Sequence, residues 1–489
     1  MNFPMIELLR NYRLFRHPRG IGRLCALALV ALCALLGAAR VALAVDIEGV
    51  QNGSIDAPKV VAVIQRPGAE GPIEVEGDVA AIPAFLDTGS SGMIIRPSFA
   101  DALGVDELPG VTFSDVGLGG TVDFDVSEEL IVRVAPNPFA EPTEVSSYNH
   151  NVGPLRTQIG PPGPQDPLLS DTNIFGMPAM VNKVTVIDPK PLNLLLTSGF
   201  LEGDFISTYI YDPGTPFNPG TADTDPGIPT TSHHVQLSYG DFERFTETTP
   251  PGSPTVQLEH NPFIGPNPVA QLEDDVPPGP PPVVIGFNGL QTSGSFLLDT
   301  GAQASFISSI LAEQLNVRQV PSTIGLGDPV LEVFDPLNPE LPGVEIESQF
   351  DLLIGGIGGI TTVPGFFLDF MTLPTIEGSA AADDPNNIRY IGAPVLVADI
   401  GLEDPDTGDF LVLDGIFGMN FLVASQFIDG FELGSAALGP FNWVTFDEPN
   451  GILGLDLIQP VPEPGSLVLS ALGAAMLIAI GLRRKYRRR

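Results

Sequence analysis

One stretch that the chain contains twice constrains its fold more than any other feature. Residues 85–92 read FLDTGSSG and residues 297–304 read LLDTGAQA, so in both copies an apolar run ends at an Asp that is followed by Thr and Gly. Further along, Ala100 and Ala312 stand at the same distance from their Asp, with Leu and Val at matching positions beyond them. This order predicts a strand, a tight loop and a short helix in each copy. Two copies at one offset predict a duplicated lobe.

The repeated Asp-Thr-Gly carries a specific chemistry. If the fold brings Asp87 and Asp299 together, the two carboxylates cannot both ionise readily, and they share one proton near neutral pH or below. The charged member can take a proton from water while the protonated member gives one to a carbonyl oxygen. In each copy the Gly permits a tight turn, and the Thr side chain can bond to backbone and hold the loop. The loop-supporting candidates are Thr88, Gly89, Thr300 and Gly301.

These motifs resemble those of the aspartic proteases, and the bilobal, pepsin-like form fits best because one chain holds both copies. The resemblance implies an all-β, two-lobed β-barrel or sandwich with internal duplication, and an active site between the lobes. It implies that Asp87 and Asp299 are catalytic, that the substrate is a peptide or protein, and that no cofactor is needed. We expect the Ser90 hydroxyl to bond to the outer oxygen of Asp87. Ala302 stands at the matching place in the second copy, as in retroviral proteases.

Two further patterns fit the same family. The sequence Ile-Phe-Gly-Met occurs at 174–177 and at 416–419, each time downstream of an Asp-Thr-Gly, where the family has a strand behind the Asp loop. Glycines also lie between β-type runs at 116–124, which predicts a hairpin. In aspartic proteases such a hairpin is the flap that closes over the substrate, and the candidate flap glycines are Gly117, Gly119 and Gly120. The pepsin-like flap carries a Tyr and residues 88–147 contain none, so an ordinary hairpin is the alternative.

The charge of the chain excludes some function classes. It has 489 residues and a formal net charge of −37, and residues 45–464 hold 10 basic against 58 acidic residues. Such a surface repels phosphates, so we expect no nucleic-acid partner. The charge is typical of a protein that must stay soluble outside the cell, and loose cation binding is the alternative. The five histidines lack the spacing of a metal site, and we predict none.

Both ends of the chain read as export signals. Residues 1–44 have a basic start, an apolar run and a small-residue cleavage site, which predicts a signal peptide. An uncleaved anchor is the alternative. The only two cysteines lie inside this segment, so if it is removed the protein has no thiol and no disulfide framework. At the other end, Pro462, Glu463 and Pro464 precede an apolar stretch, 466–482, and an arginine cluster. This tail resembles the PEP-CTERM sorting signal of Gram-negative bacteria, and a plain tail anchor is the alternative.

The sorting signal implies an exosortase-type processing enzyme as a partner. The apolar stretch predicts a transmembrane helix that anchors the protein at least before processing. Its basic end would stay in the cytoplasm and the acidic bulk would lie on the periplasmic or extracellular face.

The chain therefore divides into five predicted parts. They are the signal peptide (1–44), a first protease-like lobe (45–210), a Pro/Gly-rich linker (211–231), a second protease-like lobe (232–458) and the sorting segment (461–489). The best interpretation is a secreted, membrane-tethered aspartic endopeptidase. A catalytically inactive envelope or matrix binding protein on the same fold is the main alternative, and a cation-binding surface protein is a third.

Overall fold

The computed structural model describes residues 45–458, apart from 55, 119, 137–144, 161–172, 190–205, 222–224, 241–254, 269–278, 322–328, 358, 404–409 and 424–439. The described residues belong to one compact unit that begins at Val45. The predicted signal peptide and the predicted sorting segment lie outside them, as do the flap residue Gly119 and the predicted anchor at 466–482.

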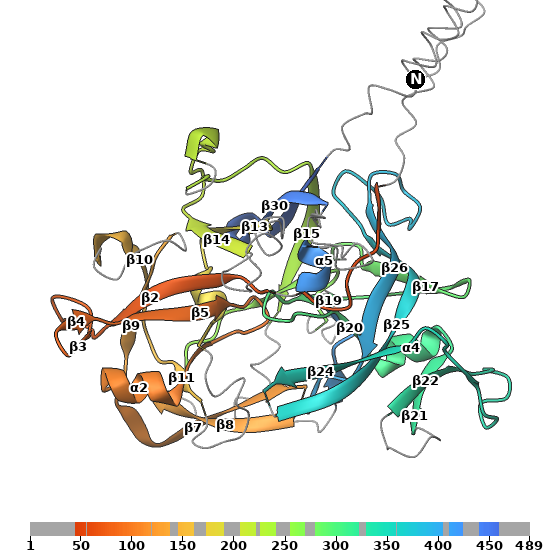
Figure 1. Ribbon diagram of the computed structural model, residues 1–489, viewed down its shortest axis with the longest axis horizontal. Coiled ribbons are helices and arrows are strands. Elements are labelled where there is room, and N and C mark those ends of the chain that lie inside the picture. Colours follow the sequence, from red (N-terminus) through yellow and green to blue (C-terminus); the bar gives the residue numbers. More distant parts are fainter. Residues whose placement is uncertain are drawn as a thin grey trace, which may run out of the picture. The chain divides into compact units, whose positions relative to one another are not determined.

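The protein is built almost entirely of strands, as predicted (Figure 1). The described α-helices are short: α2 (Pro97–Leu103), α4 (Ser309–Gln314) and α5 (Met419–Val423). A nine-stranded sheet runs in the order β10-β9-β2-β5-β12-β6-β11-β8-β7 and uses only the first part of the chain. Its strands are β2 (Lys59–Gln65), β5 (Ala81–Leu86), β6 (Met93–Ile95), β7 (Glu107–Gly117), β8 (Gly120–Ser127), β9 (Leu130–Val134), β10 (His150–Leu155), β11 (Gln158–Ile159) and β12 (Ile174–Phe175).

A second sheet has fifteen strands, and most of them come from the second half of the chain. Its main path is β14-β13-β30-β31-β15-β16-β19-β29-β20-β26-β25-β17-β18, with β1 paired to β26 and β24 paired to β25. The strands are β1 (Val45–Glu48), β13 (Val184–Pro189), β14 (Ile206–Tyr211), β15 (His233–Gly240), β16 (Asn261–Ile264), β17 (Val283–Phe287), β18 (Leu290–Gly294), β19 (Phe296–Leu298), β20 (Phe306–Ile307), β24 (Phe350–Gly356), β25 (Gly359–Leu373), β26 (Ile388–Val397), β29 (Gly415–Phe417), β30 (Phe441–Asp447) and β31 (Ile452–Leu457).

Three small sheets complete the strands. One has three strands, β21 (Val317–Pro321), β22 (Pro329–Val333) and β23 (Val344–Glu345). The other two are hairpins, β3 (Glu74–Val75) with β4 (Asp78–Val79) and β27 (Gly401–Glu403) with β28 (Phe410–Val412).

The duplication predicted from the sequence is present in the strand pairing. In the first half, β12 runs parallel to β5 and antiparallel to β6, so that Phe175 lies opposite Leu86. In the second half, β29 runs parallel to β19 and antiparallel to β20, so that Phe417 lies opposite Leu298. The Ile-Phe-Gly-Met copies therefore form the strands beside the two Asp loops, which is the position that the resemblance implies.

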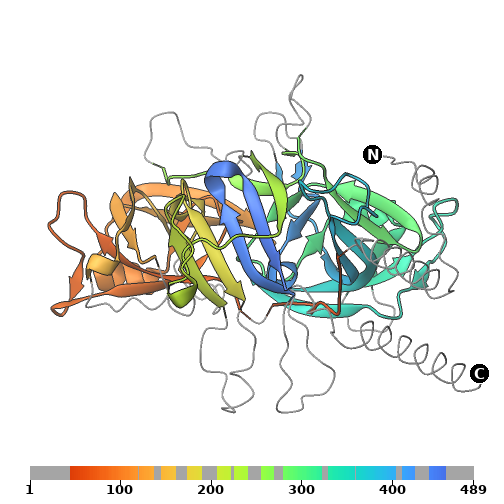
Figure 2. The same cartoon turned by 90° about the horizontal axis from the view of Figure 1, so that it is seen from above.

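The two halves are joined by pairing between distant parts of the chain. Strand β13, from the first half, pairs antiparallel with β30 near the C-terminal end of the described residues, and Figure 2 shows these strands side by side in the middle of the molecule. In the opposite direction, β1 pairs in parallel with β26 of the second half. The first residues of the predicted first lobe thus belong to the sheet of the second. Because each half contributes a strand to the other, the halves cannot separate without breaking sheet hydrogen bonds.

The Gly of each Ile-Phe-Gly-Met copy has a steric role in this architecture. A Cβ at Gly176 would lie 2.1 Å from the carbonyl oxygen of Gly92, and one at Gly418 would lie 2.5 Å from that of Ala304. Those distances are far inside van der Waals contact, and the obstructing atoms are backbone. Only Gly allows the strand to pass so close behind the Asp loop.

We predict that Gly176→Ala destabilises the protein by about 3 kcal/mol, because the added methyl must push the backbone of the first Asp loop aside. Urea unfolding of the full-length protein measures the change. Gly71→Ala is the matched control, since a Cβ there meets nothing within 4 Å. Equal midpoints for the two variants would contradict the steric role of Gly176.

Candidate active site

Asp87 and Asp299 each follow the last residue of a strand, and a backbone hydrogen bond to the neighbouring strand fixes the position of each. The Asp87 amide donates to the carbonyl of Phe175 at 3.0 Å, and the Asp299 amide donates to that of Phe417 at 3.1 Å. Beyond each Asp the chain leaves its strand and turns, and Met177 and Met419 hold the returning loop by donating to Ser90 and Ala302 at 2.8 Å each. The same backbone contacts thus shape both loops.

The two loops are locked together by the threonines. The Thr88 hydroxyl donates to the Leu298 carbonyl at 2.6 Å and accepts from the Thr300 amide at 3.1 Å. In return, the Thr300 hydroxyl donates to the Leu86 carbonyl at 2.7 Å and accepts from the Thr88 amide at 3.0 Å. Both threonines are buried, so these four bonds are shielded from water. These contacts join the loop of Asp87 to the loop of Asp299.

The two glycines bring the opposing carboxyl groups into the same space. A Cβ at Gly89 would lie 2.5 Å from Cγ of Asp299, and a Cβ at Gly301 would lie 2.4 Å from Cγ of Asp87. Each Gly therefore leaves room for the carboxyl group of the other loop. Any larger residue at either position would displace an aspartate.

The electrostatics of the pair favour a single shared proton. Burial raises the pKa of Asp87, while a hydrogen bond from Asp299 and backbone amides of Gly89, Gly301 and Ser90 act in the opposite direction. The pKa of Asp299 is raised well above its ordinary value by burial, then by the charge of Asp87 and by the bond between the two carboxyls. Because the pKa of both carboxyls is raised and the two are in contact, the pair favours holding one proton between them. As whole residues, both aspartates are half-buried, while the shifts of their carboxyl groups are dominated by burial.

The Ser90 hydroxyl is not where the sequence predicts it. It donates to the carbonyl of Gly92 at 3.2 Å, inside its own turn, because the loop folds back on itself after Asp87. Ser90 acts on Asp87 through its backbone amide instead. On the second side, the amides of Gly301 and Ala302 donate to Oδ1 of Asp299 at 2.9 and 2.8 Å. Backbone amides are thus the donors that face both aspartates among the described residues.

Two glycine hairpins, one from each half, meet at their tips. Strands β7 and β8 form the hairpin predicted as a flap, with Gly117 paired to Gly120, and β24 and β25 form a second one. A Cβ at Gly117 would lie 2.8 Å from both the Cβ and the carbonyl oxygen of Ile357, at the tip of the second hairpin. Leu118, beside Gly117, packs against an apolar cluster of the second half that includes Ala302 and Ala304 of the Asp299 loop. Apolar contacts thus connect both hairpins to the loop of one aspartate.

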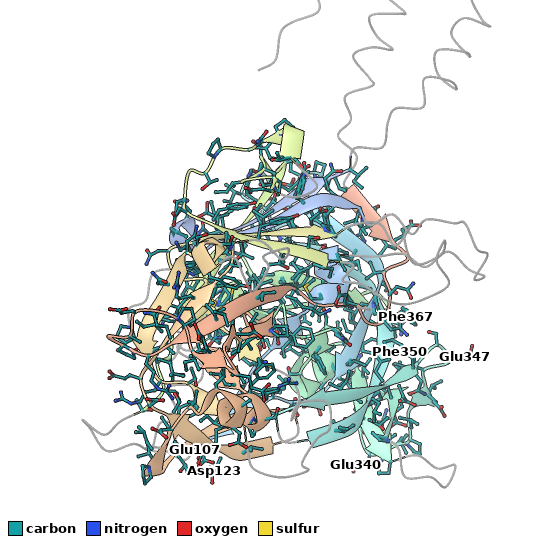
Figure 3. The ribbon with its side chains drawn as sticks, turned by 60° about the vertical axis from the view of Figure 1, so that its left-hand side comes forward. Glu107, Asp123, Glu340, Glu347, Phe350 and Phe367 are labelled. Carbon is teal, nitrogen blue, oxygen red and sulfur yellow. The ribbon has the colours of Figure 1, made fainter. Side chains whose placement is uncertain are left out.

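One face of the second hairpin packs its apolar side chains against the second half of the protein. Phe350, Leu352 and Ile354 join the same apolar cluster, while the alternate positions of β24 are exposed. Phe350 is braced by Phe367 of β25, with ring centroids 5.2 Å apart, and Figure 3 shows the two rings on neighbouring strands. Acidic side chains elsewhere, such as Glu107, Asp123, Glu340 and Glu347, point to solvent in the same view.

Two of the described histidines bond to groups outside the Asp loops. His150 contacts the Ala179 carbonyl, and His234 pairs with Glu377 at 2.6 Å. Within the described residues no group of three or more His, Cys, Asp or Glu side chains could hold a metal ion. The acidic stretch 404–409 lies outside them. None of the helices in the described part of the chain is long and apolar enough to cross a membrane.

Comparison with known proteins bears on the tail and on the fold. The family model of the PEP-CTERM protein-sorting motif matches residues 460–485. The chain carries a PEP-CTERM sorting motif. Such a motif indicates export to the cell envelope of Gram-negative bacteria and recognition by an exosortase-type enzyme, so this part of the sequence prediction is confirmed. No curated protein matches the chain.

Solved structures similar to the chain include two with 12% sequence identity. One is a protein named edgp. Its TM-score is 0.29, and the match covers 82% of this chain and 95% of the edgp chain. The other is an aspartic proteinase from Irpex lacteus, with a TM-score of 0.31, covering 83% of this chain and 96% of that one. TM-scores this low carry no argument about the fold. The all-β, two-lobed fold is instead seen directly in the strand pairings and in the paired Asp loops.

Some residues at the site have no signal in the sequence. Asn261 and Ile357 lie in stretches without a family motif, yet both contact the loop or the hairpin of the other half. The repeated glycine hairpin at 355–359 is the one feature that could have indicated the meeting of the tips. A contact between two hairpins depends on how the halves sit together, which periodicity does not encode.

We predict that Thr88→Ala destabilises the protein by about 2–4 kcal/mol, because it leaves a buried amide and a buried carbonyl without their partner. Thr88→Ser keeps the hydroxyl and should cost less than about 1 kcal/mol. Urea unfolding measures both. If the Ala and Ser variants unfolded at the same concentration, the hydroxyl would not be what joins the loops.

The raised pKa of Asp299 also predicts a pH-dependent stability. Its protonated form is favoured on folding, so this contribution is fully present below the ordinary Asp pKa and is lost as pH rises through the folded pKa. Asp299→Asn cannot ionise in either state, so its melting temperature should exceed that of the wild type at pH 7 by more than at pH 4. Asp351→Asn, at an exposed position of β24, is the control. A difference between wild type and Asp299→Asn that stays constant with pH would contradict the assignment.

Proposed function

We propose that the chain is an aspartic endopeptidase that uses Asp87 and Asp299 to activate a water molecule. The observation that carries the proposal is the pair of Asp loops held by four reciprocal threonine bonds, with a hydrogen bond between the two carboxyl groups. A structural pair of turns has no need to bury two acids against each other, since burial of charge is costly. General acid–base chemistry on an amide requires that arrangement.

In the proposed reaction, the Asp87 carboxylate takes a proton from water as the water oxygen attacks the scissile carbonyl carbon. The Asp299 carboxyl gives its proton to the carbonyl oxygen, so a neutral gem-diol forms. Asp87 then gives its new proton to the peptide nitrogen while Asp299 takes a proton from one gem-diol hydroxyl. The C–N bond breaks, the products are a carboxylic acid and an amine, and the dyad regains its starting protonation. The proposal gives the role of base to Asp87 and the role of acid to Asp299.

The two hairpins limit the shape of substrate that could reach the dyad. Gly117 and Ile357 are in contact, and the apolar cluster beside Ala302 already includes Leu118. A substrate must therefore enter as a narrow, extended segment or displace the tips, which favours unfolded chain segments over intact globular surfaces. The two hairpins would cover the dyad in place of one flap with a Tyr.

The setting of the enzyme follows from its tail. An exported chain with a PEP-CTERM motif would face substrates outside the cytoplasm, and the apolar stretch at 466–482 would tether it until an exosortase-type enzyme processes the tail. The proposed working part comprises the two lobes at 45–210 and 232–458, joined by the linker at 211–231.

A catalytically inactive binding protein on this fold is the second candidate. It is favoured by the tip contact between the hairpins and by the Ser90 hydroxyl, which bonds to Gly92 and leaves Asp87 without a side-chain donor from its own loop. In that case the dyad would persist only as part of the interlobe contact.

The test is cleavage of a quenched peptide library by the full-length protein between pH 3 and 7, beside Asp87→Asn and Asp299→Asn. We expect the wild type to cleave with an acidic optimum, and each variant to lose at least about a thousandfold in kcat. Unfolding curves for all three proteins control for loss of fold. A folded wild type that is as inert as its variants across this range would exclude the peptidase and leave the binding protein.

A further inference from the structure

We propose that Asn261 is a positioning residue for the dyad, which holds two backbone amide donors on Asp87 from the opposite half of the protein. The inference rests on the proposed function, because a positioning role has meaning only if Asp87 and Asp299 form a working dyad. Asn261 begins β16 in the second half of the chain, and its partners all lie in the first Asp loop. No family motif marks it.

The side chain of Asn261 is buried, at 1% exposure, and every polar atom has a partner. Its Nδ2 donates to the carbonyl of Thr88 at 3.2 Å and to that of Gly89 at 3.0 Å. Its Oδ1 accepts from the Ser91 hydroxyl at 2.5 Å. The orientation of the amide is fixed, because only its NH₂ group can face two carbonyl oxygens. The group therefore cannot rotate without losing all three bonds.

These bonds act on the peptide units that face the aspartate. The Thr88 carbonyl and the Gly89 amide belong to one peptide unit, and the Gly89 amide donates to Oδ1 of Asp87 at 2.8 Å. The Gly89 carbonyl and the Ser90 amide belong to the next unit, and the Ser90 amide also bonds to Asp87. Since a peptide unit is planar, fixing its carbonyl fixes the direction of its N–H. Asn261 thus anchors the far side of both units whose amides point at Asp87.

The effect should be one-sided. Hydrogen bonds to the charged form of a carboxyl favour that form, and bonds in a chain strengthen one another. Asp299 is the titratable group that contacts Asp87, and it receives its own amides from Gly301 and Ala302. All three side-chain bonds of Asn261 go to the first Asp loop, so its support reaches Asp87 and not the loop of Asp299. Asn261 therefore favours the charged form of Asp87 through the two amides that it holds in place.

The test compares Asn261→Leu with Asn387→Leu in the full-length protein. Asn387 is a matched control: it is also 1% exposed, and its Nδ2 donates to two carbonyls, of Ser379 and Ala381, at 2.7 and 3.0 Å. Those bonds stay within the loop between β25 and β26. Loss of either Asn should lower stability, so only readouts at the dyad distinguish them.

For Asn261→Leu we expect the acidic limb of the pH profile of kcat/KM to move up by about one pH unit, since the charged form of Asp87 loses support. We also expect kcat to fall by about tenfold with little change in KM, because Asn261 does not contact substrate. Asn387→Leu should leave the profile where it is. If Asn261→Leu fails to fold, Asn261→Ser, which leaves room for a water, takes its place.

A second readout is independent of activity. Carboxyl ¹³C labelling of aspartates, with Asp87→Asn to assign the signal, reports the titration of Asp87 directly. An upward shift in the Asn261 variant but not in Asn387→Leu supports the positioning role even if the wild type cleaves no peptide, in which case only the proposed function fails. An unchanged Asp87 titration, or an equal shift in both variants, overturns the inference.

Discussion

The reciprocal bonds between Thr88 and Thr300 are the contact on which the rest of the site depends. Each hydroxyl donates a hydrogen bond to a strand carbonyl of the other half and accepts one from a loop amide of that half. Each loop therefore needs the other to satisfy its buried polar groups. Because the bonded groups are buried, opening the junction would expose several of them at once. The positions of both carboxyls, of both glycines and of the strands behind them follow from this junction.

That junction supports a costly arrangement. Two acids are buried against each other, and burial raises the pKa of both, which means that their charged forms destabilise the folded state. The sheets on either side supply the compensating stability, with a continuous apolar core to which both halves contribute. The exchange of strands β1 and β13 between the halves adds to it, since the loops cannot be pulled apart by a simple hinge.

The sequence predicts those features that depend on local pattern. The Asp loops, the Ile-Phe-Gly-Met strands and the short helices follow apolar runs and fixed spacings, and the structure has them at the predicted residues. The prediction that the Ser90 hydroxyl bonds to Asp87 was wrong, because the rotamer of a side chain inside a turn depends on which acceptor lies nearer. The partner of β1, the contact between Gly117 and Ile357 and the bonds of Asn261 join residues far apart in the chain, and no periodicity encodes them.

Asn261 also shows what a single chain permits. In a symmetric dimer of identical subunits, any side chain that supports one aspartate must support the other equally, so the acid and the base can differ only through the proton itself. Here the two loops share a backbone path and differ in their surroundings, with an Asn behind one and none described behind the other. Joining the halves covalently thus releases the pair from two-fold symmetry, and each aspartate can acquire its own environment through a single substitution.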